Sequence, residues 1–366
     1  MSAPRESEYK VVTVVGARPQ FVKAAALSRA IAADGRLQEV IVHSGQHYDH
    51  NLSGSFFAEL SIPEPKYNLG IGSASHNVQL ARFILAFDEI LTDEKPDLVI
   101  VYGDTNTTSA AAIATAKRNI PLAHVEAGLR EWNKAIPEEV NKLITDAVTD
   151  LYFCPTPTGV DNLARAGVTD HVYLTGDISL DLLCGTHTQY TDKSTLLAKY
   201  GLADDYVLMT CHRDRNTDNK ANLKAILTAI GQLTAAVILP LHPRTKKAID
   251  VHGLQVMVPD NLKLVDPLPF WETQSLLRNA SLAITDSGGI IKEAYFHKVP
   301  CIIIDQQTEW IESVAEGWAV VTGPHTDSIV SMASHMQKPD KHTQALGDGH
   351  CGERIVETIC QYLHDQ

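Results

Sequence analysis

The sequence lacks any long apolar run. Across its 366 residues, no stretch approaches the roughly 18 to 20 uncharged apolar residues that a membrane span needs. The first residues, Met1 to Lys10, are polar and lack the apolar core of a signal peptide. We therefore expect a cytoplasmic protein that has no membrane partner.

The cysteine patterns of metal and disulfide sites are also missing. The chain has six cysteines, but they are scattered, with no Cys-x-x-Cys pair and no His/Cys spacing that suits zinc. Cysteine is often buried as a small apolar residue, so we expect reduced, mostly structural thiols. No metal site is predicted.

A surplus of positive charge is absent too. The net charge is -13, and an acidic surface repels polyanions, which argues against a nucleic-acid partner but leaves room for a local basic pocket that binds one diphosphate. The first strand is followed by Gly16-Ala17-Arg18-Pro19-Gln20, which lacks the Gly-x-Gly-x-x-Gly spacing of a dinucleotide site. A role with NAD is therefore disfavoured, and no cofactor is predicted.

What is present is a repeated strand-helix pattern. The β-branched run Tyr9 to Val15 predicts a first strand, and the alanine-rich stretch Phe21 to Ala33 predicts the helix after it. Near-continuous apolar strands of this kind are typical of a parallel sheet buried on both faces. The next strands predicted in this half are Val40 to His43, Asp97 to Tyr102 and Pro121 to Val125.

The pattern restarts near Tyr206. Strands are predicted at Val207 to Thr210, Ala236 to Leu241, Leu262 to Val265, Leu282 to Thr285 and Cys301 to Ile304. A length of 366 residues suits two domains better than one. We predict the α/β class, with two Rossmann-like doubly wound domains that leave a cleft between them. The predicted limits are 1–178 and 179–345, followed by a terminal helix within 346–366.

Polar residues gather directly after the predicted strands. Ligands of open α/β sheets bind at the carboxyl ends of the strands, so the shared location of these residues is more informative than any one of them. Polar groups also occur on loops for no reason but solvation, which is the alternative for each. The residues are Arg18, Gln46, His47, Asp104, Glu126, His212, Arg213, His242, Arg244, Ser287 and Glu293.

The clearest of these segments follows the strand that ends at Thr285. There the chain breaks into Ser287-Gly288-Gly289 and then into a helix, which predicts free backbone N–H groups that can hold phosphate oxygens. Glu293, about one turn into that helix, can accept hydrogen bonds from ribose hydroxyls. The alternative is a tight turn in which Ser287 is a plain N-cap.

Basic residues from both halves suit the same diphosphate. Arg18 and Lys23 can supply positive charge near a departing pyrophosphate, although Lys23 can equally be a solvated helix residue. His212 can donate to a diphosphate or sugar oxygen, or be only structural, and Arg213 adds positive potential. One strand later, His242 and Arg244 repeat this arrangement.

Carboxylates at strand and helix ends are candidates for proton transfer. Asp104 and Glu126 end strands predicted to be neighbours, and Glu138 opens a predicted helix. Burial and neighbouring carboxylates can bring one pKa towards neutrality, as general acid–base catalysis requires. The alternative is that Asp104 caps the next helix and that Glu138 only favours a helix dipole.

Together these motifs resemble the non-hydrolysing UDP-N-acetylglucosamine 2-epimerases, from Val11 to about Gly323. Several ordered motifs with the right separations are hard to meet by chance. They are Gly16-Ala17-Arg18-Pro19 with Lys23, Ser44-Gly45-Gln46-His47, Gly103-Asp104-Thr105, His124-Val125-Glu126-Ala127-Gly128-Leu129-Arg130, Pro137-Glu138-Glu139, Cys211-His212-Arg213, and Thr285-Asp286-Ser287-Gly288-Gly289 with Glu293.

The resemblance implies a GT-B-like fold whose terminal helix returns to the first domain, and a homodimer. It also implies a reaction in which the proton at sugar C2 is removed and UDP leaves a 2-acetamidoglucal, after which protonation on the opposite face and UDP re-addition follow. By position, Asp104, Glu126 and Glu138 resemble the acid and base groups. The groups that resemble those binding UDP are Arg18, Lys23, His212, Ser287, Gly288, Gly289 and Glu293.

Two departures from the family pattern leave the substrate open. The chain reads Thr308-Glu309-Trp310-Ile311-Glu312 where many members have Thr-Glu-Arg-Pro-Glu, and Pro19-Gln20-Phe21 where many have Pro-Glu-Ala. These variants resemble the branch that includes UDP-2,3-diacetamido-2,3-dideoxy-glucuronate 2-epimerases. A hydrolysing relative, a GT-B glycosyltransferase and an inactive UDP-sugar sensor are further alternatives. The regulatory site that some members form near Gln46-His47 is not carried over.

Overall fold

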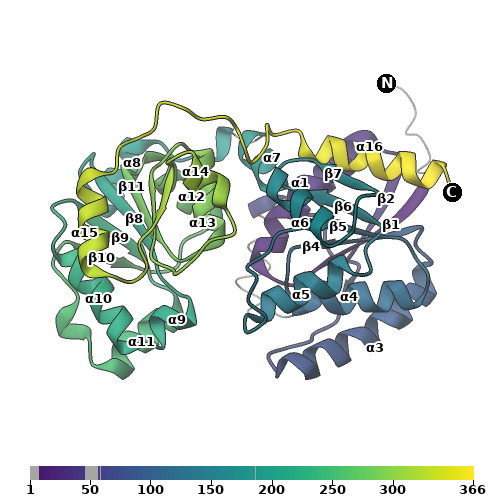
Figure 1. The fold of residues 1–366 in the computed structure, drawn as a ribbon, viewed down its shortest axis with the longest axis horizontal. Coiled ribbons are helices and arrows are strands. Elements are labelled where there is room, and N and C mark those ends of the chain that lie inside the picture. The colour runs from purple at the N-terminus through teal and green to yellow at the C-terminus, as the bar shows by residue number, and fades with distance from the viewer. Residues whose placement is uncertain (1–7, 46–56, 58, 186) are drawn as a thin grey trace. The chain divides into compact units, whose positions relative to one another are not determined.

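The computed structural model describes residues 8–45, 57, 59–185 and 187–366 (Figure 1). The chain divides into two compact units. Unit 1 comprises Met1–Thr186 together with Leu346–Gln366, and unit 2 comprises His187–Ala345. The domain limits predicted from the sequence, at 178 and 345, stay a prediction.

Unit 1 is built on a seven-stranded parallel sheet in the order β3-β2-β1-β4-β5-β6-β7. Its central strands are buried along nearly their whole length, as expected for a sheet covered by helices on both faces. The strands are β1 (Tyr9–Val15), β2 (Leu37–His43), β3 (Tyr67–Asn68), β4 (Leu98–Tyr102), β5 (Leu122–Val125), β6 (Leu151–Cys154) and β7 (Val172–Leu174). The helices are α1 (Arg18–Asp34), α3 (His76–Glu94), α4 (Asn106–Lys117), α5 (Pro137–Asp146), α6 (Pro157–Arg165), α7 (Ile178–Cys184) and α16 (Cys351–His364).

Helix α16 belongs to unit 1 although it follows unit 2 in the chain. It packs against α1 and α7, as the yellow helix of Figure 1 shows. The Asp181 carboxylate accepts a hydrogen bond of 2.6 Å from the Gly352 backbone N–H at the start of the helix. Burial raises the pKa of Asp181 to about 6. The apolar face of α16 thus completes the core of unit 1.

Unit 2 repeats the architecture with a six-stranded parallel sheet in the order β10-β9-β8-β11-β12-β13. The strands are β8 (Tyr206–Thr210), β9 (Ala236–Pro240), β10 (Leu262–Val265), β11 (Leu282–Thr285), β12 (Cys301–Ile303) and β13 (Ala319–Val321). The helices are α8 (Lys193–Tyr200), α9 (Asp214–Thr217), α10 (Lys220–Gly231), α11 (Pro243–His252), α12 (Phe270–Asn279), α13 (Gly288–Phe296), α14 (Ile311–Ala315) and α15 (Thr326–His335). One largely aliphatic core cluster packs on one face of this sheet.

Both sheets are doubly wound, which confirms the predicted α/β class. In each, the chain starts at a central strand, adds strands on one side, and then returns to add strands on the other. The order reverses between β1 and β4 in unit 1 and between β8 and β11 in unit 2. Within the described ranges, no helix is both long and apolar enough to cross a membrane.

Candidate active site

The predicted site residues collect at the two points where the strand order reverses. Such a reversal opens a crevice at the carboxyl ends of the strands, which is where ligands of open α/β sheets bind. In unit 1 the residues near this point are Lys23, Asp104 and Glu126. In unit 2 they are His212, Arg213, Ser287, Gly288, Gly289 and Glu293.

Lys23 and Glu126 form an ion pair that is almost buried. The side chain of Lys23 is 7% exposed and that of Glu126 is 11% exposed, so Lys23 is not a solvated helix residue. Glu126 adopts a φ of +74°, a left-handed conformation that costs a non-glycine residue about 1–3 kcal/mol. The pair holds one carboxylate and one ammonium group at the switch point of unit 1.

Gly103, at the end of β4, makes room for this pair. Its φ is +60°, which favours glycine. A Cβ there would lie 3.1 Å from Lys23 Nζ and 3.2 Å from Glu126 Oε2. Backbone conformation and space therefore both favour glycine at this position.

Asp104 presents a partly exposed carboxylate at the same strand end. Its Oδ2 lies 3.4 Å from Lys142 Nζ, and its side chain is 31% exposed. The alternative that Asp104 caps the next helix is wrong, because Thr105 is the N-cap of α4 and accepts the Thr108 N–H. The Asp104 carboxylate is therefore not used by the helix end that follows it.

Glu138 lies in the first turn of α5 and is partly exposed. Among the described residues it makes no hydrogen bond or ion pair with Asp104 or Glu126. Its neighbour Glu139 is buried and accepts a hydrogen bond of 2.7 Å from the Glu131 N–H. The proton-transfer role of Glu138 stays a prediction.

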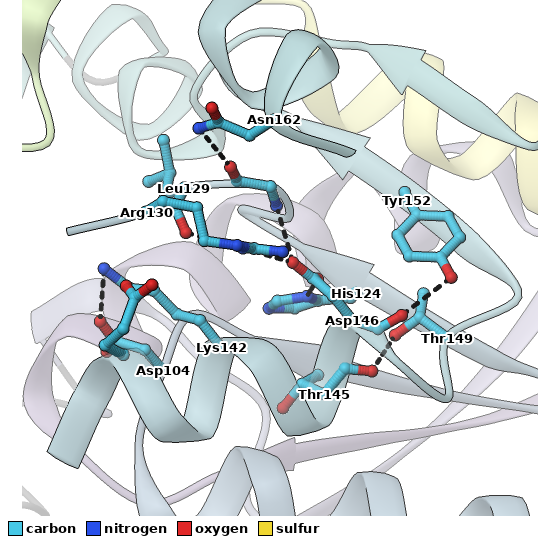
Figure 2. Close-up of polar contacts among 12 residues, drawn as sticks. Asp104, His124, Leu129, Arg130, Lys142, Thr145, Asp146, Thr149, Tyr152 and Asn162 are labelled. Atoms are coloured by element: carbon cyan, nitrogen blue, oxygen red, sulfur yellow. Dashed lines mark hydrogen bonds and ion pairs between the residues drawn. The ribbon is translucent and has the colours of Figure 1, made fainter. Parts of the chain in front are cut away.

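His124, Asp146 and Arg130 form a buried polar cluster (Figure 2). His124, on β5, is buried, and its Nδ1 and Nε2 lie 2.7 Å from Asp146 Oδ1 and 2.8 Å from the Gly103 carbonyl oxygen. Arg130 Nη1 lies 2.6 Å from Asp146 Oδ2. Burial favours a raised pKa for Asp146, but the hydrogen bond and charge of His124, with Arg130, outweigh it and lower the pKa. Asp146 is therefore an ionised carboxylate.

Sequence reasoning missed Asp146, although His124 and Arg130, its two partners, stand at the ends of one of the motifs named above. It also missed the role of Gln20, one of the departures from the family pattern. The Gln20 side chain is buried, and its Oε1 accepts the N–H groups of Gly16 and Ala17 at 2.8 and 3.0 Å. Its Nε2 donates to the Tyr102 carbonyl oxygen at 2.9 Å. This amide ties the turn after β1 to the end of β4, and a carboxylate cannot make the last of these bonds.

In unit 2, Asp286 joins the loops that follow β8 and β11. Its buried carboxylate accepts the backbone N–H groups of His212 and Arg213, each at 3.0 Å, and the Asn216 Nδ2 at 3.1 Å. Asp286 therefore holds the two loops together, and the amides that can face a phosphate come from the residues after it.

The start of α13 has backbone amides whose N–H groups find no acceptor in the described ranges of the chain. The first intrahelical bond runs from the Ile291 N–H to the Ser287 carbonyl oxygen, so Gly288, Gly289 and Ile290 have no helical acceptor. The Ser287 hydroxyl makes no capping hydrogen bond, so the plain N-cap alternative is wrong for this side chain.

Neither backbone conformation nor available space requires glycine at position 288 or 289. Gly288 and Gly289 do not have positive φ, and a Cβ would meet no atom closer than 3.5 Å at Gly288 or 3.7 Å at Gly289. What glycine provides here is close access to the amides, which suits an anion. The atoms nearest a Gly288 Cβ include Trp310 Nε1 and, at 4.0 Å, Arg213 Nη2.

The loop after β12 carries unpaired polar atoms beside this turn. Trp310 is buried, and its Nε1 has no hydrogen-bond partner among the described residues. The same holds for Gln307 Nε2 and for both carboxylate oxygens of Glu312. Buried polar groups are normally paired, so this loop has hydrogen-bonding capacity left for a ligand. Of this loop, the sequence marked only Thr308–Glu312, as a departure from the family pattern.

The Glu293 carboxylate is positioned by hydrogen bonds that involve Gln274 and His297. His297 Nε2 lies 2.9 Å from Gln274 Oε1, and Gln274 Nε2 donates to Glu293 Oε2 at 2.6 Å. Burial lowers the pKa of His297 to about 4, so the imidazole is neutral at physiological pH. The Glu293 Oε1 faces the first turn of α13, 3.8 Å from a Gly289 Cβ.

The two histidines after β8 and β9 lie together, but Arg244 has another partner. The rings of His212 and His242 stack with centroids 5.2 Å apart. His242 Nδ1 accepts the Arg244 N–H at 3.1 Å and so caps α11. The Arg244 guanidinium pairs with Asp218 at 3.1 Å on the surface. The substrate roles of His242 and Arg244 stay predictions.

Three predicted site residues have side chains outside the described part of the structure. They are Arg18, which begins α1, and Gln46 and His47.

Unit 2 also has a hollow of about 460 Å³ near the carboxyl ends of β9 and β10, a size that suits a small ligand. It is lined by Tyr200, Leu241, Leu264, Val265, Asp266 and Leu268.

Comparison with known proteins agrees with this geometry. A family model described as UDP-N-acetylglucosamine 2-epimerase matches residues 29–360. A UDP-N-acetylglucosamine 2-epimerase homolog of Methanococcus maripaludis is 41% identical, over 96% of this chain and 99% of that protein. The UDP-2,3-diacetamido-2,3-dideoxy-D-glucuronate 2-epimerase of Pseudomonas aeruginosa is 39% identical, with 96% and 99% covered.

A solved structure has the same fold. The crystal structure of Methanocaldococcus jannaschii UDP-GlcNAc 2-epimerase in complex with UDP-GlcNAc and UDP matches with a TM-score of 0.89. The two chains are 35% identical, and the match covers 96% of this chain and 99% of that one. The predicted Rossmann-like, GT-B type of α/β fold is thereby confirmed. This chain belongs to the UDP-N-acetylglucosamine 2-epimerase family.

Proposed function

We propose that this protein is a non-hydrolysing UDP-N-acetylglucosamine 2-epimerase that interconverts UDP-GlcNAc and UDP-ManNAc. The observation that carries the proposal is the set of carboxylates at the end of the unit 1 sheet. Asp104 and Glu126 follow adjacent strands, and the buried ammonium of Lys23 pairs with Glu126. Proton transfer at a sugar carbon needs acid and base groups of this kind, fixed near one another.

In the proposed reaction a carboxylate removes the proton from sugar C2. The C1–O bond to UDP breaks, its electron pair leaves with the β-phosphate oxygen, and a 2-acetamidoglucal forms. A second group then returns a proton to the opposite face of C2, and the UDP oxygen adds back to C1. Asp104, Glu126 and Glu138 are the proposed acid and base groups. No step of this cycle transfers a hydride or an electron, so it needs no electron carrier.

Unit 2 is proposed to bind the UDP part of the substrate. The free amides of Gly288 and Gly289, with the Ser287 hydroxyl, would hold the diphosphate, and Arg213 would add positive charge. Glu293 would accept hydrogen bonds from the ribose. His212 would donate to the diphosphate, and Arg18 and Lys23 would stabilise UDP as it leaves.

A second candidate substrate is UDP-2,3-diacetamido-2,3-dideoxy-glucuronate. The P. aeruginosa enzyme that is named for this sugar is 39% identical to the chain, against 35% for the M. jannaschii UDP-GlcNAc 2-epimerase. Both substrates would use the same C2 chemistry. They differ in the groups at C3 and C6, and so in contacts outside the proton-transfer set.

The test is proton NMR of each UDP-sugar incubated with the protein in deuterium oxide. We expect deuterium at C2 and a second UDP-sugar epimer, and the preferred substrate is the one that exchanges faster. Accumulation of free ManNAc would instead indicate hydrolysis. A GT-B glycosyltransferase should show no exchange without an acceptor, and its activity should survive Glu126→Gln. In an epimerase, Glu126→Gln should abolish the exchange.

The assembly and location of the protein are further parts of the proposal. The resemblance implies a homodimer, and light scattering should give twice the chain mass of 40.0 kDa. A monomer mass at assay concentration would contradict this. A cytoplasmic location also stays a prediction, which cell fractionation would test.

A further inference from the structure

The cluster of His124, Asp146 and Arg130 takes no part in the proposed reaction (Figure 2). Its side chains are only 1%, 5% and 4% exposed. Buried charge is costly unless it is well paired, so this arrangement needs a physical reason. Because a sugar cannot reach these groups, any effect on the reaction must pass through what they hold.

His124 faces a hydrogen-bond acceptor on each side of its ring. The Gly103 carbonyl oxygen can only accept, and Asp146 is an ionised carboxylate. The ring therefore bridges the Gly103 carbonyl oxygen and the Asp146 carboxylate, with one ring nitrogen directed at each. A rigid ring bonded at both ends acts as a spacer of fixed length between the Gly103 peptide and α5.

The peptide held by His124 is part of the candidate site. Gly103 directly precedes Asp104, and its Cα faces the Lys23–Glu126 pair at the distance where a Cβ would touch both partners. A shift of this peptide therefore moves Asp104 and also opens or closes the space around Glu126.

Asp146 also holds the turn after β5, which contains Glu126 and Gly128. Its Oδ2 accepts the Gly128 N–H at 3.3 Å, two residues beyond Glu126. The Gly128 carbonyl oxygen in turn accepts a hydrogen bond of 3.0 Å from Asn162 Nδ2. The same carboxylate thus connects the spacer at Gly103 to the turn that carries Glu126.

We propose that His124, held by Asp146, is a positioning residue that sets the separation of the Asp104 and Glu126 carboxylates. This inference rests on the proposed function, because it assigns the two carboxylates to proton transfer at C2. General acid–base catalysis requires hydrogen-bond reach of about 2.6–3.2 Å to the reacting atom. A misplacement of about 1 Å can reduce the rate by about 100-fold.

Two substitutions test separately the two hydrogen bonds of the His124 ring, to Asp146 and to the Gly103 carbonyl oxygen. His124→Asn places an amide nitrogen near the position of Nδ1, which keeps the bond to Asp146 and removes the donor to Gly103. His124→Gln places its nitrogen near the position of Nε2 and does the reverse. We expect His124→Asn to lower kcat for C2 exchange about 100-fold, with KM and UDP affinity little changed. We expect His124→Gln to recover part of that loss.

The matched control is Glu94→Gln. Glu94 is also buried in unit 1, with a side chain 4% exposed, and it pairs with Lys66 and Lys10. Lys10 lies at the amino end of β1, whereas Asp104 and Glu126 follow the carboxyl ends of their strands. We expect this variant to lose thermal stability and to keep its kcat. A general loss of stability therefore cannot account for a kcat effect confined to the His124 variants.

The outcomes separate the two proposals. If the unmodified protein exchanges neither UDP-sugar, the proposed function is wrong. If the unmodified protein is active, and the His124→Asn variant folds and keeps full kcat, the positioning role is wrong. If His124→Asn does not fold, Arg130→Lys perturbs Asp146 from its other side and is expected to lower kcat without raising KM, and an unchanged kcat there would overturn the role.

Discussion

Gly288→Ala should separate the stability of the protein from its affinity for UDP. Gly288 is the first residue of α13, its φ is not positive, and a Cβ there would meet no atom closer than 3.5 Å. The fold should therefore accept alanine, and the free energy of unfolding should stay the same or rise by up to about 1 kcal/mol, since alanine is the better helix former.

The same methyl group should weaken UDP binding. A helical Cβ points towards the N-terminus of its helix, which is where an oxygen bound by the first amides would lie. The loss of one hydrogen bond to a charged oxygen costs about 1.5–3 kcal/mol. That corresponds to roughly a tenfold to hundredfold increase in Kd for UDP.

Isothermal titration with UDP and denaturant unfolding measure the two effects separately. The matched control is Gly253→Ala, at the C-cap of α11 in the same unit, where φ is +66° and no atom lies within 4 Å of a Cβ. It should lose about 1 kcal/mol of stability through backbone strain and bind UDP normally. If Gly288→Ala binds UDP as tightly as the unmodified protein, the start of α13 does not hold the diphosphate.

Two further predictions concern Gln274, which supports Glu293, and Asp181, which holds the start of α16. Gln274→Leu removes the donor to Glu293, and we expect UDP affinity to fall roughly tenfold by calorimetry; unchanged affinity would show that Glu293 needs no such support. Burial raises the pKa of Asp181 to about 6 in the folded state, above its unfolded value of 3.8. The stability that this group contributes is therefore fully present below pH 3.8, and it is lost as the pH rises through about 6. Asp181→Asn keeps an oxygen for the Gly352 N–H and should be about 1–2 kcal/mol more stable at pH 8, after allowance for partial exposure, but not at pH 4. A pH-independent difference in the free energy of unfolding would contradict this assignment.

The strand ends could be predicted from the sequence because the rule that locates them is simple. Apolar runs mark parallel strands, and the residues after them must meet at one edge of each sheet. This placed Glu126 at the switch point of unit 1 and Ser287 at that of unit 2. It could not tell that Lys23 is buried against Glu126, because helix α1 has no feature in the sequence that sets this pairing.

Partners distant in sequence were beyond such reasoning. His124 and Asp146 are 22 residues apart, and Gln274 and Glu293 are 19 apart. Each pair is set by how a helix packs on the sheet, which one sequence does not specify. The direction of the Asp286 carboxylate is likewise a matter of loop geometry. The sequence marks Gln20 and Trp310 as unusual, but only the hydrogen bonds show what each does.

The return of α16 to unit 1 has a consequence for biosynthesis. Unit 2 is one continuous segment, whereas unit 1 is complete only when α16, which follows unit 2 in the chain, has been translated. Until then, the apolar residues of unit 1 that Ile355, Val356 and Ile359 cover in the finished protein face water. A nascent chain halted just after unit 2 therefore carries an open apolar surface, which is the state that chaperones bind and that aggregates at high concentration.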